Sequence, residues 1–325
     1  MPATIEAPCV WHGEELFSRA DWLHQVDATH LEQIQCLMEG NGKPTPELAR
    51  LFSNIRHSLE NHSGATLIRG LPVETLDEDC AKTLLLKLAS QIGSPVSQSS
   101  AGDLVFSVRD AGYKESDPRS RGPNTRRKLT FHSDRCDVIG FLCLRQAKSG
   151  GGNDLVSSAA IHNRLLQTRP ELLEELYRPF YYKRHNVDTG NRLPYCRQPV
   201  FSSTQGKFAC NLLRILIDRA YAMPELPDMT NTQREALDAI ESLAAQPGMH
   251  AGIRQQPGDM LLMNNWVTLH RRSEFEDYCE PERKRHILRV WISPPNNRPI
   301  DPLFRDNYGA VDAGSIRGGM AQGIG

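Results

Sequence analysis

The sequence predicts a mainly β protein with flanking helices, of the α+β class. Short apolar runs of strand length recur from Gly102 onward, whereas apolar residues at helical spacing occur in the first 100 residues and in three later interruptions. The 325 residues are enough for one large hydrophobic core, and β-rich enzymes of this length often form a single unit. We therefore expect residues 1–325 to form one domain with additions around a β core.

The N-terminal part, residues 1–100, has an α/β pattern. Residues 46–62 and 77–92 carry apolar side chains at helical spacing. The segment Ala65-Thr-Leu-Ile-Arg-Gly70 between them is typical of a short strand. This part is therefore expected to precede the β-rich remainder as two helices and a strand.

Strands dominate the remainder of the chain, and helices interrupt them. The Pro257-Gly258-Asp259 sequence predicts a turn between two of the strands. Thr232 followed by Glu235 predicts the start of a helix through a capping box. The expected strands are residues 104–108, 138–144, 252–255, 260–263 and 285–292, and the expected helices are residues 160–177, 211–222 and 232–246.

Three segments are expected to vary in conformation or to shape a pocket. Residues 110–130 show no periodicity, are rich in Arg, Pro, Gly and Ser, and are longer than an ordinary connection, which is typical of a lid loop. Residues 181–201 are the expected pocket wall, because substrate specificity usually lies in loops. The Gly-rich end, residues 314–325, is expected to be a mobile tail.

Composition excludes several classes of partner and location. With 38 Lys and Arg against 39 Asp and Glu, the chain has no basic field for nucleic acid or an anionic membrane surface. The start of the chain lacks a signal-peptide pattern, and no run approaches 18 apolar residues. The eight cysteines include no C-x-x-C pair and are expected to be reduced thiols. We expect a cytoplasmic protein that binds a small molecule, with a homo-oligomer left open.

Phe131-His132-Ser133-Asp134 is the sharpest local signal for chemistry. On an extended chain, residues two positions apart point the same way and lie about 6.6 Å apart. His132 and Asp134 can therefore present an imidazole and a carboxylate to one metal ion. A third ligand would complete the two-histidine, one-carboxylate set of non-haem Fe(II) sites, which leaves coordination positions open.

The third ligand must come from elsewhere in the chain, and sequence context favours His270. This histidine ends an apolar run, residues 260–269, that follows a predicted turn. His286 is the main alternative, although it alternates with Arg285 on the final strand and would face the opposite side. The helical position of His162 favours a place facing solvent or in the first turn of its helix. The remaining downstream histidines, for which ordinary strand or loop roles are expected, are His185 and His250.

The final predicted strand carries two arginines on one face. Arg285 and Arg289 share that face with apolar side chains, because residues alternate between faces along a strand. A buried arginine usually meets an anion, and its planar fork suits a carboxylate. A dicarboxylate co-substrate would satisfy this arrangement. Taken alone, the pattern favours the alternative, in which both arginines pair with acidic side chains on a solvated face.

These motifs together resemble the Fe(II)/2-oxoglutarate-dependent oxygenases of the taurine dioxygenase-like (TauD/TfdA) family. The resemblance rests on His132-x-Asp134, on His270 after a Gly-Asp turn and an Asn-Asn pair, and on Arg285 fifteen residues further. It covers most of the chain, up to Trp291. The N-terminal segments that contribute to it are Thr66-Leu-Ile-Arg-Gly-Leu71 and Ile92-Gly-Ser-Pro95.

The resemblance implies a fold, cofactors and residue roles. The fold is a double-stranded β-helix, a jelly-roll core on which residues 1–100 pack. Fe(II) is the metal, and 2-oxoglutarate and O2 are the co-substrates. The implied catalytic and metal-binding residues are His132, Asp134 and His270, with Arg285 on the distal carboxylate of 2-oxoglutarate and Arg289 near the co-substrate or substrate.

One motif departs from the family pattern. Many relatives have Gly-Gly-x-Thr before a helix, with the threonine hydroxyl helping to hold 2-oxoglutarate, whereas this chain has Gly151-Gly152-Asn153-Asp154. An aspartate there would repel a carboxylate unless it turned away or paired with an arginine. Ser157 or Ser158 is the expected substitute for the threonine.

The implied activity is hydroxylation of an unactivated C–H bond of a small metabolite, with release of succinate and CO2. An amino acid or related carboxylate is the preferred substrate class, and desaturation, epoxidation or cyclisation uses the same ligands. Two alternatives come from other classes. One is a non-catalytic small-molecule binding protein on the same scaffold, and the other is a cupin-like iron dioxygenase that does not use 2-oxoglutarate and leaves Arg285 without an anionic partner.

Overall fold

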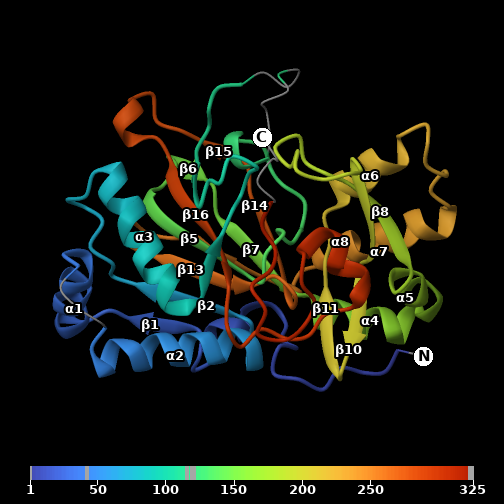
Figure 1. Ribbon diagram of the computed structural model, residues 1–325, viewed down its shortest axis with the longest axis horizontal. Coiled ribbons are helices and arrows are strands. Elements are labelled where there is room, and N and C mark those ends of the chain that lie inside the picture. Colours follow the sequence, from blue (N-terminus) through green and yellow to red (C-terminus); the bar gives the residue numbers. More distant parts are fainter. Residues whose placement is uncertain (1, 41–43, 114–116, 118–121, 321–325) are drawn as a thin grey trace.

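A large mixed sheet forms the centre of the molecule in the computed structural model, which describes residues 2–40, 44–113, 117 and 122–320 (Figure 1). Its strand order is β1-β2-β13-β5-β16-β3, and β4 pairs with β16 outside this path. All its pairings except β1 with β2 are antiparallel. The strands are β1 (Leu23–Gln25), β2 (Ala65–Arg69), β3 (Ser94–Val96), β4 (Val105–Val108), β5 (Val138–Arg145), β13 (Met260–Asn264) and β16 (His286–Ser293).

A smaller antiparallel sheet faces the large one. Its strand order is β12-β7-β14, and it extends into a short pairing of β6 with β15. Two hairpins, β8-β9 and β10-β11, complete the β structure of the described chain. The strands are β6 (Ser149–Gly150), β7 (Asn153–Ser157), β8 (Pro179–Lys183), β9 (Tyr195–Pro199), β10 (Phe201–Thr204), β11 (Lys207–Cys210), β12 (His250–Ile253), β14 (Thr268–Arg272) and β15 (Phe275–Glu276).

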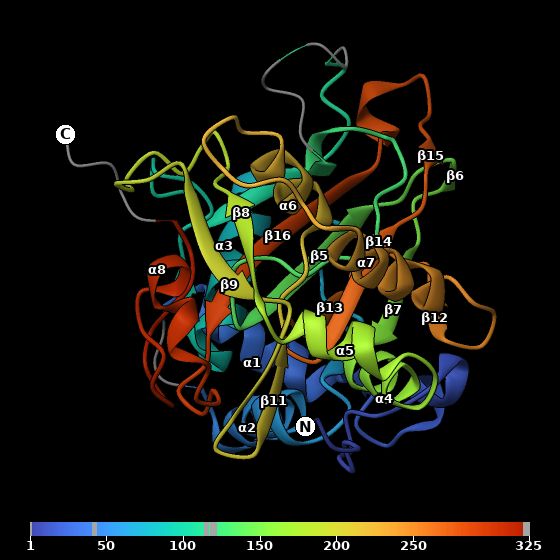
Figure 2. The same cartoon turned by 90° about the vertical axis from the view of Figure 1, so that its right-hand side faces the viewer.

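Helices cover the outer faces of both sheets. Figures 1 and 2 show α1, α2 and α3 on the side of the large sheet and α4, α5 and α7 on the side of the small one. The helices are α1 (Ala28–Met38), α2 (Pro46–Asn61), α3 (Glu78–Ile92), α4 (Ser158–Thr168), α5 (Pro170–Leu176), α6 (Arg214–Tyr221), α7 (Asn231–Ala244) and α8 (Arg305–Tyr308). Short 3-10 turns occur at Gly13–Ser18, Gly122–Asn124, Pro281–Arg283 and Pro302–Phe304.

The alternation of side chains along the strands divides the core into an inner and two outer parts. Ile287 and Trp291 of β16 point between the sheets, where they meet Leu155 and Ala251 of the small sheet. Leu288 of β16 points the other way, against the helices on the large sheet. A third cluster lies between the small sheet and α4, α5 and α7. Two sheets packed face to face around an inner core are the arrangement of a double-stranded β-helix, and the predicted fold class is confirmed.

The N-terminal part continues the large sheet. β2 pairs with β13 in an antiparallel register that sets Leu67 against Leu261, and β1 adds beside β2. α2 begins at Pro46 because the Thr45 side chain accepts a hydrogen bond from the Leu48 amide. The predicted strand and both predicted helices of this region are present. α1 is an additional helix, in which Ile34 is the one buried residue, so the helix has no clear apolar face.

Two predicted helix boundaries are wrong. The helix expected at 160–177 is two helices, because Pro170 starts α5 and cannot continue the hydrogen bonding of α4. The capping box of α7 is formed by Thr230 and Gln233, and the predicted pair Thr232 and Glu235 lies inside the helix. An interior threonine carries the same sequence pattern as a cap, so the pattern alone did not fix the position.

The expected lid loop and tail are only partly described. Of residues 110–130, the positions 114–116 and 118–121 lie outside the described residues, as do 321–325 of the tail. The described end of the loop runs alongside β14 and β15: the Leu129 amide donates to the Arg272 carbonyl, at 2.9 Å, and the Phe275 amide donates to the Arg126 carbonyl, at 3.1 Å. Over the described residues, every helix is too short or too polar to cross a membrane.

Candidate metal centre

His132 and His270 lie side by side although 138 positions separate them in the sequence. Each donates its backbone N–H to the other's carbonyl oxygen, at 2.9 Å in both directions, and so forms an isolated antiparallel bridge. Side chains of directly opposed residues point to the same face of a β pair. The two imidazole rings accordingly have centroids 4.4 Å apart.

Asp134 completes a cluster with the two histidines. One ligand atom from each of the three side chains lies within 4.8 Å of the other two. Two ligand atoms on one ion lie at most about 4.2 Å apart, which is twice a bond of about 2.1 Å. A small adjustment of the side chains therefore suffices for all three to contact one ion. The structure brings together the three residues that the sequence singled out.

The orientation of the His132 ring is fixed by its backbone neighbour. Its Nδ1 lies 2.9 Å from the Thr130 carbonyl oxygen, an acceptor, so Nδ1 carries the proton. The unprotonated Nε2 is then free to bind a metal. This arrangement, in which one ring nitrogen is held by a carbonyl and the other binds the ion, is the usual one for metal-bound histidine.

His270 is kept neutral by its surroundings. Burial, with the neighbouring His132 ring, lowers the pKa of His270 to about 3. Its Nε2 lies 3.9 Å from Asp134 Oδ2, on the side of the cluster. A neutral imidazole is the form that binds a metal ion.

Asp134 is buried and remains ionised. Burial alone would raise the pKa of its carboxyl, but the positive charge of nearby groups, Arg289 above all, outweighs burial and lowers the pKa. Arg289 Nη1 lies 3.3 Å from Asp134 Oδ2. The Asp134 backbone N–H donates to the Asn265 side chain at 3.2 Å. A buried carboxylate held by one cation and neighbouring imidazoles suits a divalent cation.

Hydrogen bonds to Gln98 hold both the side chain and the backbone of Arg289. Its Nε donates to Gln98 Oε1 at 2.6 Å, and the Gln98 amide nitrogen donates back to the Arg289 carbonyl at 3.0 Å. Its guanidinium carbon lies 5.4 Å from the centre of the Phe106 ring and 5.1 Å from that of Trp291. Gln98 is a site residue that sequence reasoning missed, because the contact joins segments 191 positions apart.

Arg285 is a buried cation whose side chain has no acidic partner among the described residues. It is 2% exposed, and its Nε and Nη1 are buried without a hydrogen-bond partner. Burial lowers the pKa of Arg285 to about 10. The alternative of a solvated, ion-paired face is therefore wrong for Arg285, and Arg289 meets an acid only inside the site. Arg285 shares a face of the final strand with Arg289, which contacts Asp134. Unpartnered buried donors on that face fit an anionic ligand.

The aspartate that departs from the family pattern does not face the site. Asp154 accepts a hydrogen bond from Arg271 Nε at 2.7 Å, on the outer face of the small sheet. The alternation along β14 places Arg271 opposite in direction to His270 and Arg272. The same alternation shows that Arg272 shares the face of His270, a signal that sequence reasoning overlooked.

The other histidines lie outside the cluster. His286 faces away from it, as predicted, with its Nε2 3.2 Å from Ser107 Oγ. His162 is buried in α4, with its Nε2 3.0 Å from the Tyr177 hydroxyl, so the expectation of a solvent-facing or first-turn position is wrong. His162 packs there because α5 and the β10-β11 hairpin cover that face of α4 with aromatic rings.

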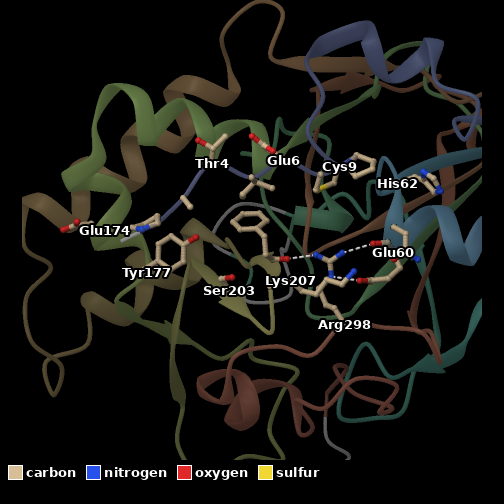
Figure 3. A pocket seen from close by; sticks show the side chains of 18 of the residues that line it. Thr4, Glu6, Cys9, Glu60, His62, Glu174, Tyr177, Ser203, Lys207 and Arg298 are labelled. Atoms are coloured by element: carbon tan, nitrogen blue, oxygen red, sulfur yellow. Dashed lines mark hydrogen bonds and ion pairs between the residues drawn. The ribbon is translucent and has the colours of Figure 1, made fainter.

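Two cavities in the described part of the chain differ in their relation to His132, Asp134 and His270. A cavity of about 920 Å³ lies between the N-terminal segment, the end of α2, α5 and the β10-β11 hairpin (Figure 3). Arg298 lies on its wall and is fully engaged with Glu60 and the Phe208 carbonyl. A smaller cavity of about 40 Å³ is lined by Asp134, Trp291 and residues of the β8-β9 hairpin region. The smaller one is the relevant cavity, because Asp134 forms part of its wall.

Comparison with known proteins identifies the class. Residues 39–291, more than half of the chain, match the family described as taurine catabolism dioxygenase TauD, TfdA family. The chain is 29% identical over 306 residues to FR-33289 synthase of Streptomyces rubellomurinus, covering 89% of this chain and 90% of that protein. It is 30% identical over 192 residues to the taurine hydroxylase-like protein SAT17 of Stachybotrys chartarum, covering 54% of this chain and 48% of that protein.

Solved structures agree on the fold. Asparagine oxygenase in complex with Fe(II), 3-hydroxyasparagine and succinate superposes with a TM-score of 0.65 at 19% identity, covering 84% of this chain and 93% of that one. The non-haem iron oxygenase OrfP with Fe and α-ketoglutaric acid gives 0.58 at 16% identity, covering 83% and 94%.

This chain belongs to the TauD, TfdA family. It is an Fe(II)/2-oxoglutarate-dependent dioxygenase, and the predicted family, enzyme class and cofactors are confirmed.

Proposed function

We propose that His132, Asp134 and His270 hold the Fe(II) ion of a small-molecule hydroxylase. The single observation that supports this most is the convergence of their ligand atoms within 4.8 Å. The donor set of two neutral imidazoles and one carboxylate is the one that non-haem Fe(II) oxygenases use. Bound Fe(II) and O2 would couple the decarboxylation of 2-oxoglutarate, to succinate and CO2, to hydroxylation of a substrate C–H bond.

Arg285 is proposed to bind the distal carboxylate of 2-oxoglutarate. The free Nε and Nη1 atoms of Arg285 provide two N–H donors of the kind a carboxylate accepts in pairs. Asp154 does not oppose this contact, because it pairs with Arg271 on the other face of its strand. Arg289 holds the Asp134 carboxylate in place and is the proposed cation beside the co-substrate or substrate.

The substrate is proposed to be an amino acid or a related carboxylate that enters beside Asp134. The small cavity there is lined by Arg184, His185 and Asp188 of the β8-β9 connection, which supports residues 181–201 as the pocket wall. Asparagine oxygenase and OrfP carry hydroxylated amino acids in their structures, which favours the same substrate class here. Residues 110–130 are proposed as the lid. Cytoplasmic location and oligomeric state stay predictions.

Anaerobic titration tests the metal and co-substrate sites. Addition of Fe(II) and then 2-oxoglutarate should produce the weak visible charge-transfer band of a chelated 2-oxo acid, and His270→Ala should abolish it. Absence of the band in the wild-type protein would support the non-catalytic binding protein. Iron binding with no response to 2-oxoglutarate would support the cupin-like dioxygenase.

A succinate-release screen tests the substrate class. Wild-type protein with Fe(II), 2-oxoglutarate and O2 should form succinate faster when an amino acid or related carboxylate that it hydroxylates is present. The panel should contain amino acids, taurine and matched amines that lack the acid group. Stimulation by the amines alone would contradict a carboxylate substrate.

A further inference from the structure

A second buried guanidinium lies beside Arg285. Arg272 is on β14, two residues after His270, and is 4% exposed. Its guanidinium carbon lies 5.0 Å from the centre of the Phe275 ring, and that of Arg285 lies 5.2 Å from the same centre. Two cations therefore lie close to one aromatic ring.

These two guanidinium groups have more donors than partners. The Nε of Arg272 is buried without a partner, as are the Nε and Nη1 of Arg285. In the described part of the chain, neither group forms an ion pair with an acidic side chain. Buried arginines without an acid, adjacent to each other, repel one another and leave hydrogen bonds unmade, which is costly unless an anion is bound.

The space beside them is kept open by a glycine. A Cβ atom at Gly151, where φ is +71°, would lie 3.1 Å from Arg285 Nε. The acidic residue nearest along that segment, Asp154, is engaged by Arg271 on the outer face. The space beside Arg285 is therefore lined by N–H donors, and no carboxylate of β7 lies there to pair with them.

Arg272 is also hydrogen-bonded to residues 122–129, the described end of the proposed lid loop. Its Nη1 and Nη2 donate to the carbonyl oxygens of Gly122 and Arg127, at 3.4 and 2.5 Å. The Leu129 amide donates back to the Arg272 carbonyl at 2.9 Å. One side chain thus connects residues 122–129 to β14, while its Nε has no hydrogen-bond partner.

We propose that Arg272 binds the distal carboxylate of 2-oxoglutarate together with Arg285, and that this contact couples co-substrate binding to the ordering of residues 122–129. A carboxylate has two oxygens and about four lone-pair positions, enough for the N–H groups of the three free nitrogen atoms. Its negative charge also removes the repulsion between the two guanidinium groups. This inference rests on the proposed function, because it assigns a residue to the same co-substrate site.

The test compares Arg272→Gln with Arg271→Gln in the anaerobic Fe(II) titration. Both variants lose one positive charge from neighbouring positions of β14, but only Arg272 faces the site. The probes are 2-oxoglutarate and 2-oxobutyrate, which lacks the distal carboxylate. Arg272→Gln should bind 2-oxoglutarate roughly tenfold or more weakly, as expected for a lost charge-assisted hydrogen bond. It should bind 2-oxobutyrate as the wild type does, and Arg271→Gln should stay within about twofold for both probes.

Amide hydrogen exchange provides a second readout. In the wild-type protein with Fe(II), 2-oxoglutarate should slow exchange in residues 122–129, and 2-oxobutyrate should not. Arg272→Gln should remove this protection. Arg272→Lys, which keeps the charge, tests the same contact if the glutamine variant folds poorly, and it should retain part of the selectivity for 2-oxoglutarate.

The outcomes separate this inference from the proposed function. Equal 2-oxoglutarate affinity in Arg272→Gln and wild type would overturn the role of Arg272 alone. An equal loss for both probes would also overturn it, because the side chain would then act only on the fold. A wild-type protein that binds neither probe would refute the proposed function itself.

Discussion

Replacement of Arg285 by methionine should have opposite effects on the free protein and on co-substrate binding. The wild-type side chain buries two nitrogen atoms without partners, and an unmet buried donor costs roughly 1–3 kcal/mol. Methionine fills much of the same volume and carries no charge. The free variant should therefore be more stable than the free wild type by roughly 1–3 kcal/mol, after some loss of packing.

The same substitution should nearly remove stabilisation by 2-oxoglutarate. With Fe(II) present and 2-oxoglutarate at about 100 times Kd, the wild type gains about 2.7 kcal/mol. Loss of a charge-assisted contact of roughly 1.5–3 kcal/mol weakens binding by roughly 10- to 150-fold. The gain at the same concentration then falls to about 1.4 kcal/mol or less.

Thermal unfolding with and without 2-oxoglutarate measures both effects. At roughly 2 °C per kcal/mol for a chain of this size, the wild-type Tm should rise by about 5 °C with 2-oxoglutarate and that of Arg285→Met by about 3 °C or less. The free variant should melt a few degrees above the free wild type. An unchanged ligand-induced shift would refute the assignment of Arg285 and move the anchor to Arg289. A lower Tm of the free variant would refute the cost assigned to the unpaired donors.

Three further substitutions test other parts of the structure. Asp154→Asn should leave the affinity for 2-oxoglutarate within about twofold of the wild type, because the Asp154 carboxylate pairs with Arg271 away from the site. A larger gain in affinity in the anaerobic Fe(II) titration would show that Asp154 repels the co-substrate. Burial lowers the pKa of His286 to about 4, so the unfolded chain takes up this proton below about pH 6.5 and the folded one does not until about pH 4. His286→Gln should therefore reduce the loss of stability between pH 6.5 and 4 by up to about 3 kcal/mol in urea unfolding, and an unchanged pH profile would contradict this. Asp137→Ala should destabilise the protein by about 3–5 kcal/mol, because Arg317, whose Nε donates to Asp137 at 2.8 Å, would stay buried without an acidic partner. A decrease in the free energy of unfolding of less than about 1 kcal/mol, measured by chemical unfolding, would contradict the role of this pair.

The sequence predicted the parts of the site that local spacing controls. His132 and Asp134 are two residues apart, and the alternation along the final strand places Arg285 and Arg289 on one face. His270 was selected from several histidines by its context after an apolar run. In the structure, β14 brings it opposite His132 through two backbone hydrogen bonds.

Other parts depend on contacts between distant segments and had no local signal. The Gln98 amide holds Arg289 from 191 positions away. Asp137 joins Trp266, Ser293, Asn297 and Arg317 in one buried network, and a single aspartate in the sequence carries no sign of this. Such contacts follow from the way the sheets fold together, which periodicity does not encode.

The secondary structure shows the same contrast between features that a local sequence pattern predicts and features that it does not. Apolar runs predicted β2, β5, β13 and β16 closely, because these strands are buried and rich in apolar residues. The helix pattern of residues 160–177 was continuous in hydrophobicity, and only the backbone limits of Pro170 divide it into two helices. The burial of His162 followed from aromatic residues of later segments, which its own helix did not reveal.

A crystal structure of the protein grown anaerobically with Fe(II), recorded near the iron absorption edge, tests the proposed metal site most directly. One anomalous peak per chain should lie within about 2.3 Å of His132 Nε2, His270 Nε2 and one carboxylate oxygen of Asp134. The peak should be absent in His270→Ala. Iron bound elsewhere, or contacting only one of these side chains, would contradict the assignment of the three residues to a single ion.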